Sequence, residues 1–329
     1  MQTRQRILPF TLFVLTIAMA SLIQPATAAA SAEGSFQRTL QVTGPVNLDL
    51  TTGSGTITVH SGSDNQVQIT GHIRVTNWFG GDAEERVHRI EANPPIQQSG
   101  NDIRIGHIED PDLRHNVSIS YELVVPAATA LHSHTGSGNQ EIDGIHGIVE
   151  AEAGSGNLGI SNIGDTVRAD TGSGSVDINH VKGSVQAKAG SGSIRATDIG
   201  GGFEGHTGSG HIVLEQSAPG SVRVDTGSGG MELRGVRGSL EAKAGSGTVH
   251  AEGEPTGAWN VRSGSGSVEL RVPSNASFDL DAHTGSGSVS IAHPLTVQGA
   301  IGRKEVRGKV GAGGVPVEIE TGSGDIEIN

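Results

Sequence analysis

Residues 171–178 read Thr-Gly-Ser-Gly-Ser-Val-Asp-Ile, and this stretch decides the fold because its Gly-Ser-Gly core recurs along the chain. The steps between successive copies are 18 or 19 residues up to Gly264, and then 21 and 37 residues. A short fixed period predicts a repeat architecture in which each copy is one structural unit. Because the last step is close to two periods, we expect one further coil without the signature near Gly302. The copies begin at Gly136, Gly154, Gly172, Gly190, Gly208, Gly227, Gly245, Gly264, Gly285 and Gly322.

Each repeat reads as two short strands and two bends. An apolar residue such as Val167 stands five positions before each first Gly, and a small residue such as Ala169 often stands three positions before it. Polar residues lie between them, and this period of two predicts a half-buried strand. The same alternation resumes after the turn, as at Val176 and Ile178. Trp259 falls in the first apolar column, so we predict that it fills the core.

Two arrangements of these strands fit the pattern. One is an antiparallel meander of hairpins, which a Gly-Ser turn permits. It would leave a long apolar face uncovered, and open sheets rarely exceed ~10 strands. We therefore predict a single-stranded parallel β-solenoid with coils of about 18 residues. About eleven coils at ~4.8 Å each would form a rod roughly 50 Å long.

The first 28 residues predict a signal peptide. Arg4 and Arg6 precede an apolar run over residues 7–23, and Ala26-Thr27-Ala28 forms a small-residue cleavage site. The alternative is a membrane anchor, which the shortness of the run and the cleavage site disfavour. No later apolar run is long enough to span a bilayer. We expect an exported protein in the periplasm, on the cell surface or outside the cell.

The rest of the chain divides at residue 130. Residues 29–130 lack the regular period, and we predict irregular β coils and a cap there, because terminal repeats usually cover the end of the core. The stretch 82–92 is the one helical-looking segment, and Pro94-Pro95 stops it. Residues 131–329 are predicted to form the regular Gly-Ser-Gly solenoid.

Several motifs together resemble a known family. They are the leader, the strand Tyr-Glu-Leu-Val-Val-Pro at 121–126, the recurrent Thr-Gly-Ser-Gly, and the closing Thr-Gly-Ser-Gly-Asp-Ile at 321–326. Over residues 34–329 they resemble the bacterial β-strand-repeat proteins known as candidate adhesins. That resemblance implies a single-stranded parallel β-solenoid in the cell envelope and no established catalytic residue.

A search for metal chemistry finds only weak signals. His134, His206 and His283 share an outward column but lie several coils apart, so we interpret them as solvated surface residues. A calcium-binding repeat would need a recurring Asp in its turn, and this turn is Gly-Ser-Gly. We predict no metal site and no cofactor. The one loop whose composition suits a cation contains His107, Asp110, Asp112 and His115.

Two pattern breaks are the candidate binding surface. Trp78 and Phe79 are the only aromatic residues that we expect to be exposed, and a basic loop over residues 303–309 interrupts an acidic chain. Pattern breaks in a repeat are where function often lies. The basic residues of the loop are Arg303, Lys304, Arg307 and Lys309.

Charge and composition limit the partners. The formal net charge of -13 disfavours nucleic acid. Along the columns, Asp170 with Lys188 and Asp225 with Lys243 are predicted to be stabilising neighbours. We expect an envelope or extracellular macromolecule, either protein or glycan, as the partner.

Two functions remain open on the sequence. The favoured one is a non-catalytic rod for adhesion or scaffolding at the cell envelope, because no paired carboxylates or nucleophile sets are recognisable. The alternative is a β-helix enzyme that acts on envelope or extracellular polysaccharide.

Overall fold

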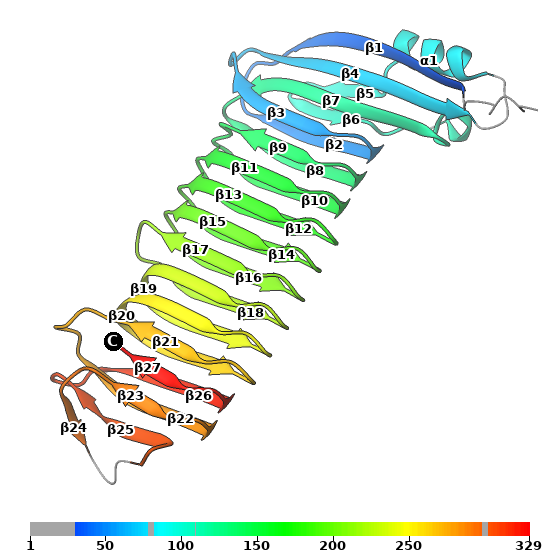
Figure 1. The fold of residues 1–329 in the computed structure, drawn as a ribbon. Coiled ribbons are helices and arrows are strands. Elements are labelled where there is room, and N and C mark those ends of the chain that lie inside the picture. The colour runs from blue at the N-terminus through cyan, green and yellow to red at the C-terminus, as the bar shows by residue number, and fades with distance from the viewer. Residues whose placement is uncertain (1–29, 78–81, 109, 298–301) are drawn as a thin grey trace, which may run out of the picture.

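The computed structural model describes residues 30–77, 82–108, 110–297 and 302–329. Its strands stack into a rod with a wider head at the N-terminal end (Figure 1). The described residues contain one α-helix, α1 (Ala83–Ala92), and one short 3-10 helix, η1 (Pro111–Leu113). The predicted helix at 82–92 is therefore confirmed, as is the prediction of an all-β, solenoid-like architecture.

Two strands joined by a Gly-Ser-Gly corner form one rung of the rod. Equivalent strands of successive rungs pair in parallel, so that Val149 is the register partner of Val167 and Val167 that of Val185. The first strands are β8 (Thr129–Ser137), β10 (Val149–Ser155), β12 (Val167–Thr171), β14 (Val185–Ala189), β16 (Phe203–Thr207) and β18 (Val222–Thr226). The second strands are β9 (Gln140–Asp143), β11 (Leu158–Ile163), β13 (Val176–Val181), β15 (Ile194–Ile199) and β17 (Ile212–Gln216).

Two long strands continue the stack. β19 (Met231–Ala244) and β20 (Val249–Ser263) each run through the second bend, so each one ends one rung and begins the next. β21 (Val268–Arg271) completes the rung that starts in the second half of β20. The register shifts within β19 mark the bends that the strand crosses.

The Gly-Ser-Gly corners are glycine-rich because successive rungs approach each other closely there. A Cβ atom on Gly174 would lie 1.7 Å from the backbone oxygen of Gly156 in the rung before. Thr171, one position before the corner, donates from Oγ1 to that same oxygen over 2.8 Å and accepts from the Gly174 N–H over 3.2 Å. The hydroxyl thus ties two rungs together, which explains why Thr so often precedes the signature.

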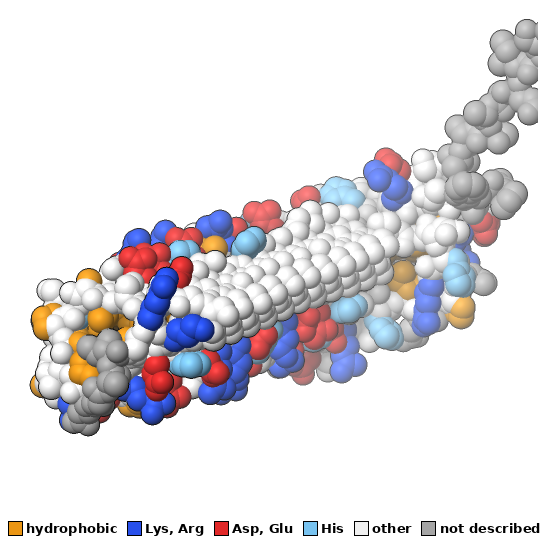
Figure 2. All heavy atoms as spheres, turned by 60° about the horizontal axis from the view of Figure 1, so that its bottom comes forward, with side chains coloured by type: hydrophobic (Ala, Val, Ile, Leu, Met, Phe, Trp, Pro, Cys, Tyr) orange, Lys and Arg blue, Asp and Glu red, His pale blue; other side chains and the backbone are white. Residues whose placement is uncertain are grey.

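The core is a set of inward columns along the rod axis. Val167 and Ala169 are buried, and so is Trp259, whose indole Nε1 donates to the Gly238 carbonyl over 3.0 Å. The prediction that Trp259 fills the core is confirmed. On the outside, Figure 2 shows a long strip without charged side chains, bordered on both sides by bands of acidic and basic side chains.

The head is built from antiparallel strands. β1 (Ala30–Gln41) pairs with β4 (Gln66–Asn77), β4 pairs with β7 (Val117–Pro126), and α1 packs against β1 and β4. The strands β5 (Ile96–Ser99) and β6 (Asp102–Ile105) form a hairpin beside them. The rung of β2 (Val46–Ser54) and β3 (Ile57–Gly62) lies between β6/β7 and β8/β9, out of chain order.

The C-terminal end is also out of chain order. β26 (Val315–Ser323) and β27 (Ile326–Ile328) insert between β20/β21 and the rung of β22 (Phe278–Ser286) and β23 (Val289–Ile291). β24 (Leu295–Val297) and β25 (Glu305–Val310) add antiparallel strands beyond β22.

Two predictions are corrected here. The coil expected near Gly302 does not form in the described residues, because β25 pairs antiparallel with β22 and the last signature returns to the stack. The sheet as a whole is mixed rather than parallel, because antiparallel pairs stand at both ends.

Candidate functional site

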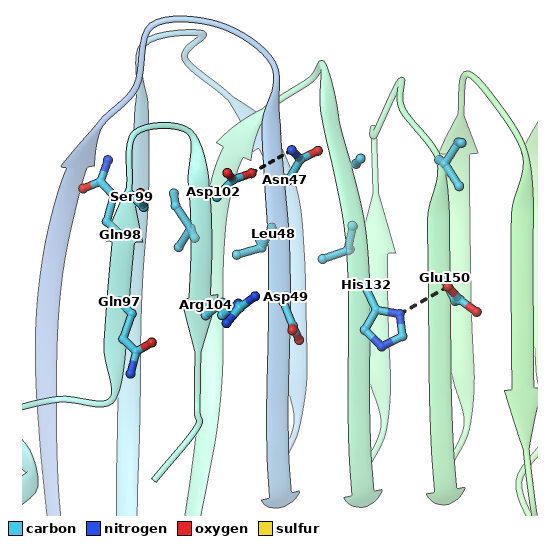
Figure 3. A pocket seen from close by; sticks show the side chains of 14 residues that line it. Asn47, Leu48, Asp49, Gln97, Gln98, Ser99, Asp102, Arg104, His132 and Glu150 are labelled. Atoms are coloured by element: carbon cyan, nitrogen blue, oxygen red, sulfur yellow. Dashed lines mark hydrogen bonds and ion pairs between the residues drawn. The ribbon is translucent and has the colours of Figure 1, made fainter. Parts of the chain in front are cut away.

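A groove of about 780 Å³ lies where the head meets the rod, on the outer face of β2, β6, β8 and β10 and beside β5 (Figure 3). We call it the head groove. Its lining combines amide, carboxylate and basic side chains with a few apolar ones, so it offers hydrogen bonds and charge of both signs. The lining residues are Asn47, Leu48, Asp49, Gln97, Gln98, Ser99, Asp102, Ile103, Arg104, Ala130, Leu131, His132, Ile148 and Glu150.

The strand register places side chains of different charge beside one another in the head groove. Asp49 on β2 is the register partner of both Arg104 on β6 and His132 on β8. His132 is in turn the register partner of Glu150 on β10. Because alternate residues of a strand point to the same face, these four side chains form a row across the rungs.

The carboxylate of Glu150 is held on two sides. His132 Nδ1 lies 3.3 Å from Glu150 Oε2, and Arg168 Nε lies 3.3 Å from Glu150 Oε1. Across the groove, Asn47 Nδ2 donates to Asp102 Oδ1 over 2.8 Å (Figure 3). These contacts fix the polar side chains as hydrogen-bond donors and acceptors for a ligand.

Ile148 supplies an apolar contact at the edge of the head groove. Its side chain is 53 % exposed, and only Val124 is a second exposed large hydrophobic residue in the described part of the chain. An exposed aliphatic side chain next to fixed polar groups is a suitable anchor for a macromolecular partner.

A second groove, of about 880 Å³, continues along the rod from β10 to β20. It shares Ile148 and Glu150 with the head groove, so the two are continuous. We call it the rod groove. One side carries small residues and the other a row of charged and amide side chains. The small residues are Thr166, Ser184, Gly202, Ser221, Ser239 and Ala258, and the row contains Glu150, Arg168, Gln186, Glu204, Arg223, Glu241 and Asn260.

Carboxylates in this row are held in their charged form. Hydrogen bonds from His206 and Gln186, each over 3.0 Å, lower the pKa of Glu204 below its usual value. A hydrogen bond from Lys243, 2.5 Å long, does the same to the pKa of Glu241. Both groups are therefore ionised at neutral pH, which suits them to binding rather than to proton donation.

The first predicted pattern break cannot be placed. Trp78 and Phe79 lie outside the described residues. The segment that precedes them, β4, belongs to the head and pairs with β1 and β7.

The basic segment is a strand in part, and not only the predicted loop. Arg303 and Lys304 precede β25, whereas Arg307 and Lys309 lie within it. Arg307 Nε contacts Asp281 Oδ1 over 3.0 Å, and Lys304 Nζ donates to a backbone carbonyl of β22 over 2.8 Å. These two basic side chains are therefore engaged within the protein, and the segment lies far from the head groove (Figure 1).

The histidines lie beside carboxylates. His134 Nδ1 is 3.5 Å from Glu152, and His206 Nε2 is 3.0 Å from Glu204. In the cation loop considered above, Asp110 contacts Arg89 over 2.5 Å. Within the described residues no group of three or more His, Asp or Glu side chains is arranged to hold a metal ion.

The charged row of the rod groove is the feature that sequence reasoning missed. The predicted neighbours Asp225 and Lys243 are register partners, but Lys243 binds Glu241 on its own strand, and Arg223 reaches the same carboxylate over 2.8 Å. The signal was present in the column four residues before each signature, where acidic and basic residues often alternate.

Comparisons with known proteins place the chain. In the described residues no helix is both long and apolar enough to cross a membrane. No curated protein sequence matches the chain. A crystal structure of a candidate cell adhesion protein from Clostridium sporogenes aligns over 90% of this chain and 99% of its own, with 13% identity and a TM-score of 0.23. A candidate adhesin from Bacteroides fragilis aligns over 90% and 97%, with 10% identity and a TM-score of 0.32. No residue role is carried over from either structure. The family model described as Toastrack DUF4097 matches residues 165–329, which is half of the sequence, and the chain therefore belongs to the Toastrack DUF4097 family.

Proposed function

We propose that this chain is a non-catalytic, exported protein of the cell envelope that acts as an adhesin or a surface scaffold. Its regular part is a parallel solenoid with coils of about 18 residues. Its partner is an envelope or extracellular macromolecule, a protein or a glycan, and the head groove and rod groove are where it binds.

The observation that carries this proposal is the continuity of the two grooves. A surface that extends from β2 to β20 suits an extended partner better than a small molecule. Many modest polar contacts along such a surface give affinity through their number rather than through one deep pocket.

The lining supports binding over catalysis. Phe203 is the only aromatic residue that lines the two grooves, and it is buried, so sugar rings would find no exposed aromatic face to stack on. Glu204 and Glu241 are held ionised by their neighbours, whereas a glycosidase needs one carboxyl that carries a proton.

Export is supported by the position of the first strand. β1 begins at Ala30, two residues after the predicted cleavage at Ala28. Removal of the leader would leave a mature chain that enters the head without a long tail. The proposed location is the periplasm, the cell surface or the extracellular space.

A retention assay tests the proposal. Mature protein is incubated with peptidoglycan, a glycan panel and native envelope fractions, in metal-free and metal-supplemented buffer. We expect saturable retention without released product, weakened by Ile148→Asp in the groove. The matched control is Val124→Asp, which places the same charge at the other exposed aliphatic residue.

Two outcomes contradict the proposal. Retention that Ile148→Asp leaves unchanged would remove the grooves as the binding site. Reproducible release of product, abolished by Glu150→Gln or Asp49→Asn, would replace the adhesin with an enzyme that acts on polysaccharide.

A further inference from the structure

The face that carries the rod groove has two outward rows of side chains. Row A stands four residues before the first Gly of each corner, and row B stands two residues before it. Their order in space differs from their order in the sequence, because the rung of β26 precedes that of β22. Thus Glu320 follows Arg262 along row B, and His283 comes after Glu320.

We propose that the macromolecule bound along this face is a second copy of this chain, packed antiparallel. The inference rests on the proposed function, since it names the partner of the same grooved face. A two-fold axis that runs along the strand direction, between β18 and the second half of β19, reverses the order of the rungs. It keeps row A opposite row A and row B opposite row B.

Charges complement each other at the centre of this arrangement. Arg223 in row A faces Glu241 of the second copy, and Asp225 in row B faces Lys243 of the second copy. Within one chain these four residues form two adjacent register pairs, Arg223 with Glu241 and Asp225 with Lys243. The two-fold axis repeats both attractions between the chains.

The complementarity continues away from the axis. Lys188 on β14 faces Glu320 on β26, and Arg168 on β12 faces Asp281 on β22. These residues lie several rungs apart within one chain, so no intramolecular contact joins either pair. Their matching is therefore a property of the face as a whole rather than of neighbouring strands.

The remaining row A positions add amide groups opposite carboxylates. Gln186 faces Glu318, and Glu204 faces Asn260. An amide N–H₂ donates to a carboxylate oxygen, so both pairs are favourable. Asn260 already shows this chemistry within the chain, where its Nδ2 donates to Glu318 over 3.1 Å.

The remaining row B positions contain the histidines. Asp170 faces His283, which gains a proton as the pH falls, and His206 faces Arg262. His206 Nε2 is already 3.0 Å from Glu204 Oε1, so a partial charge on its ring is balanced within its own chain. From β12 to β22, no two formally like charges face each other at neutral pH with neutral His.

Other registers lose this match. A shift by one rung in one direction opposes Arg223 with itself and Glu204 with Glu241. A shift in the other direction opposes Glu241 with itself and Glu204 with Glu318. A parallel arrangement opposes Glu318 with Glu320 and also brings the two heads to the same end.

The antiparallel register also has room for the head. It sets β8 opposite β24 of the second copy, so β2, β6 and the antiparallel strands of the head extend past the end of the other rod. The shared length is eight rungs, or roughly 38 Å at ~4.8 Å per rung. Such a narrow polar interface predicts reversible, salt-sensitive association.

The test uses sedimentation velocity of the mature protein at low and high salt, with two single variants. Lys188→Glu and Glu320→Lys each place like charges opposite each other twice in a homodimer, so each should weaken self-association about tenfold or more. An equimolar mixture of the two variants should associate as the wild type does, because both facing pairs regain opposite charges. Within one chain the two positions are about 24 Å apart, so only contact between chains restores them.

The matched control is Arg195→Glu, an equal charge reversal on β15, which lies on the other ladder of strands. It should leave self-association unchanged. Circular dichroism and thermal melting establish that all three variants fold.

The outcomes separate the two proposals. A wild-type protein that stays monomeric at about 0.1 mM and low salt, or a mixture that does not associate, overturns the second copy as partner. If the same protein is still retained on envelope material through Ile148, the adhesin or scaffold proposal survives. If self-association follows the expected pattern but no envelope material is retained, the copy pairing stands and the wider function fails.

Discussion

Phe203 and Gly205 are predicted to form one packing unit, and a pair of substitutions tests this. Phe203 stands in a column that otherwise holds mainly Val or Leu, and Gly205 stands in a column of small residues. A Cβ atom built on Gly205 would lie 2.6 Å from Phe203 Cε1 and 3.0 Å from Phe203 Cζ. The ring therefore occupies the space that the side chain of Ala187 fills in the rung before.

The expected magnitudes follow from this geometry. Phe203→Val removes about four buried carbon atoms, which at ~0.8 kcal/mol per methylene group destabilises the fold by roughly 3 kcal/mol. Gly205→Ala forces the ring to move and should cost about 1–3 kcal/mol. The double variant recreates the Val and Ala of neighbouring rungs, so it should lie within about 1 kcal/mol of the wild type.

Urea denaturation followed by circular dichroism measures the free energies of unfolding of all four proteins. The informative quantity is the difference between the double variant and the sum of the single variants. If the two single effects simply add, Phe203 and Gly205 do not share one space and the packing argument is wrong. The double variant also controls for any unrelated effect of either residue.

Three further predictions concern the corner, the pH dependence and the leader. Thr226→Val should destabilise the rod by about 1–3 kcal/mol, because the buried hydroxyl bonds the backbone of two successive corners, and unfolding in urea checks this. Hydrogen bonds from Ser161 and then Asn162 lower the pKa of Asp143, so its stabilisation is present above the ordinary value of 3.8 and is lost as the pH falls through the lowered folded-state value. Asp143→Asn should therefore lower the melting temperature near neutral pH but leave it close to that of the wild type at about pH 2. N-terminal sequencing of exported protein should show that the chain begins directly after Ala28, and an intact leader would refute the cleavage.

Much of the rod could be predicted because each residue column has a local cause. The burial of Val167 and Trp259 follows from alternation along a strand, and the corner glycines follow from the close approach of rungs. The helix α1 follows from an acidic start, a pair of apolar residues and a double proline. None of these features depends on which rung lies next to which.

The order of the rungs at the ends could not be predicted for the same reason. The signature at Gly322 identifies a corner but not its neighbours, and the structure places it between Gly264 and Gly285. Only the irregular step to Gly322 hinted at a different path, and an extra coil explained it equally well. The facing pairs of charged residues depend on this order, so reading the columns in sequence order would have scrambled them.

The insertion of β26 and β27 between two earlier rungs changes how the rod resists force. A terminal rung of a simple solenoid can be peeled away by breaking the hydrogen bonds on one side only. Here β26 is bonded to both β20 and β22, and β27 to both β21 and β23. Tension on this segment must therefore shear ladders on two sides at once. Deleting it would not shorten the rod by a rung but would leave β22, β23 and their hairpin without the surface they stack on.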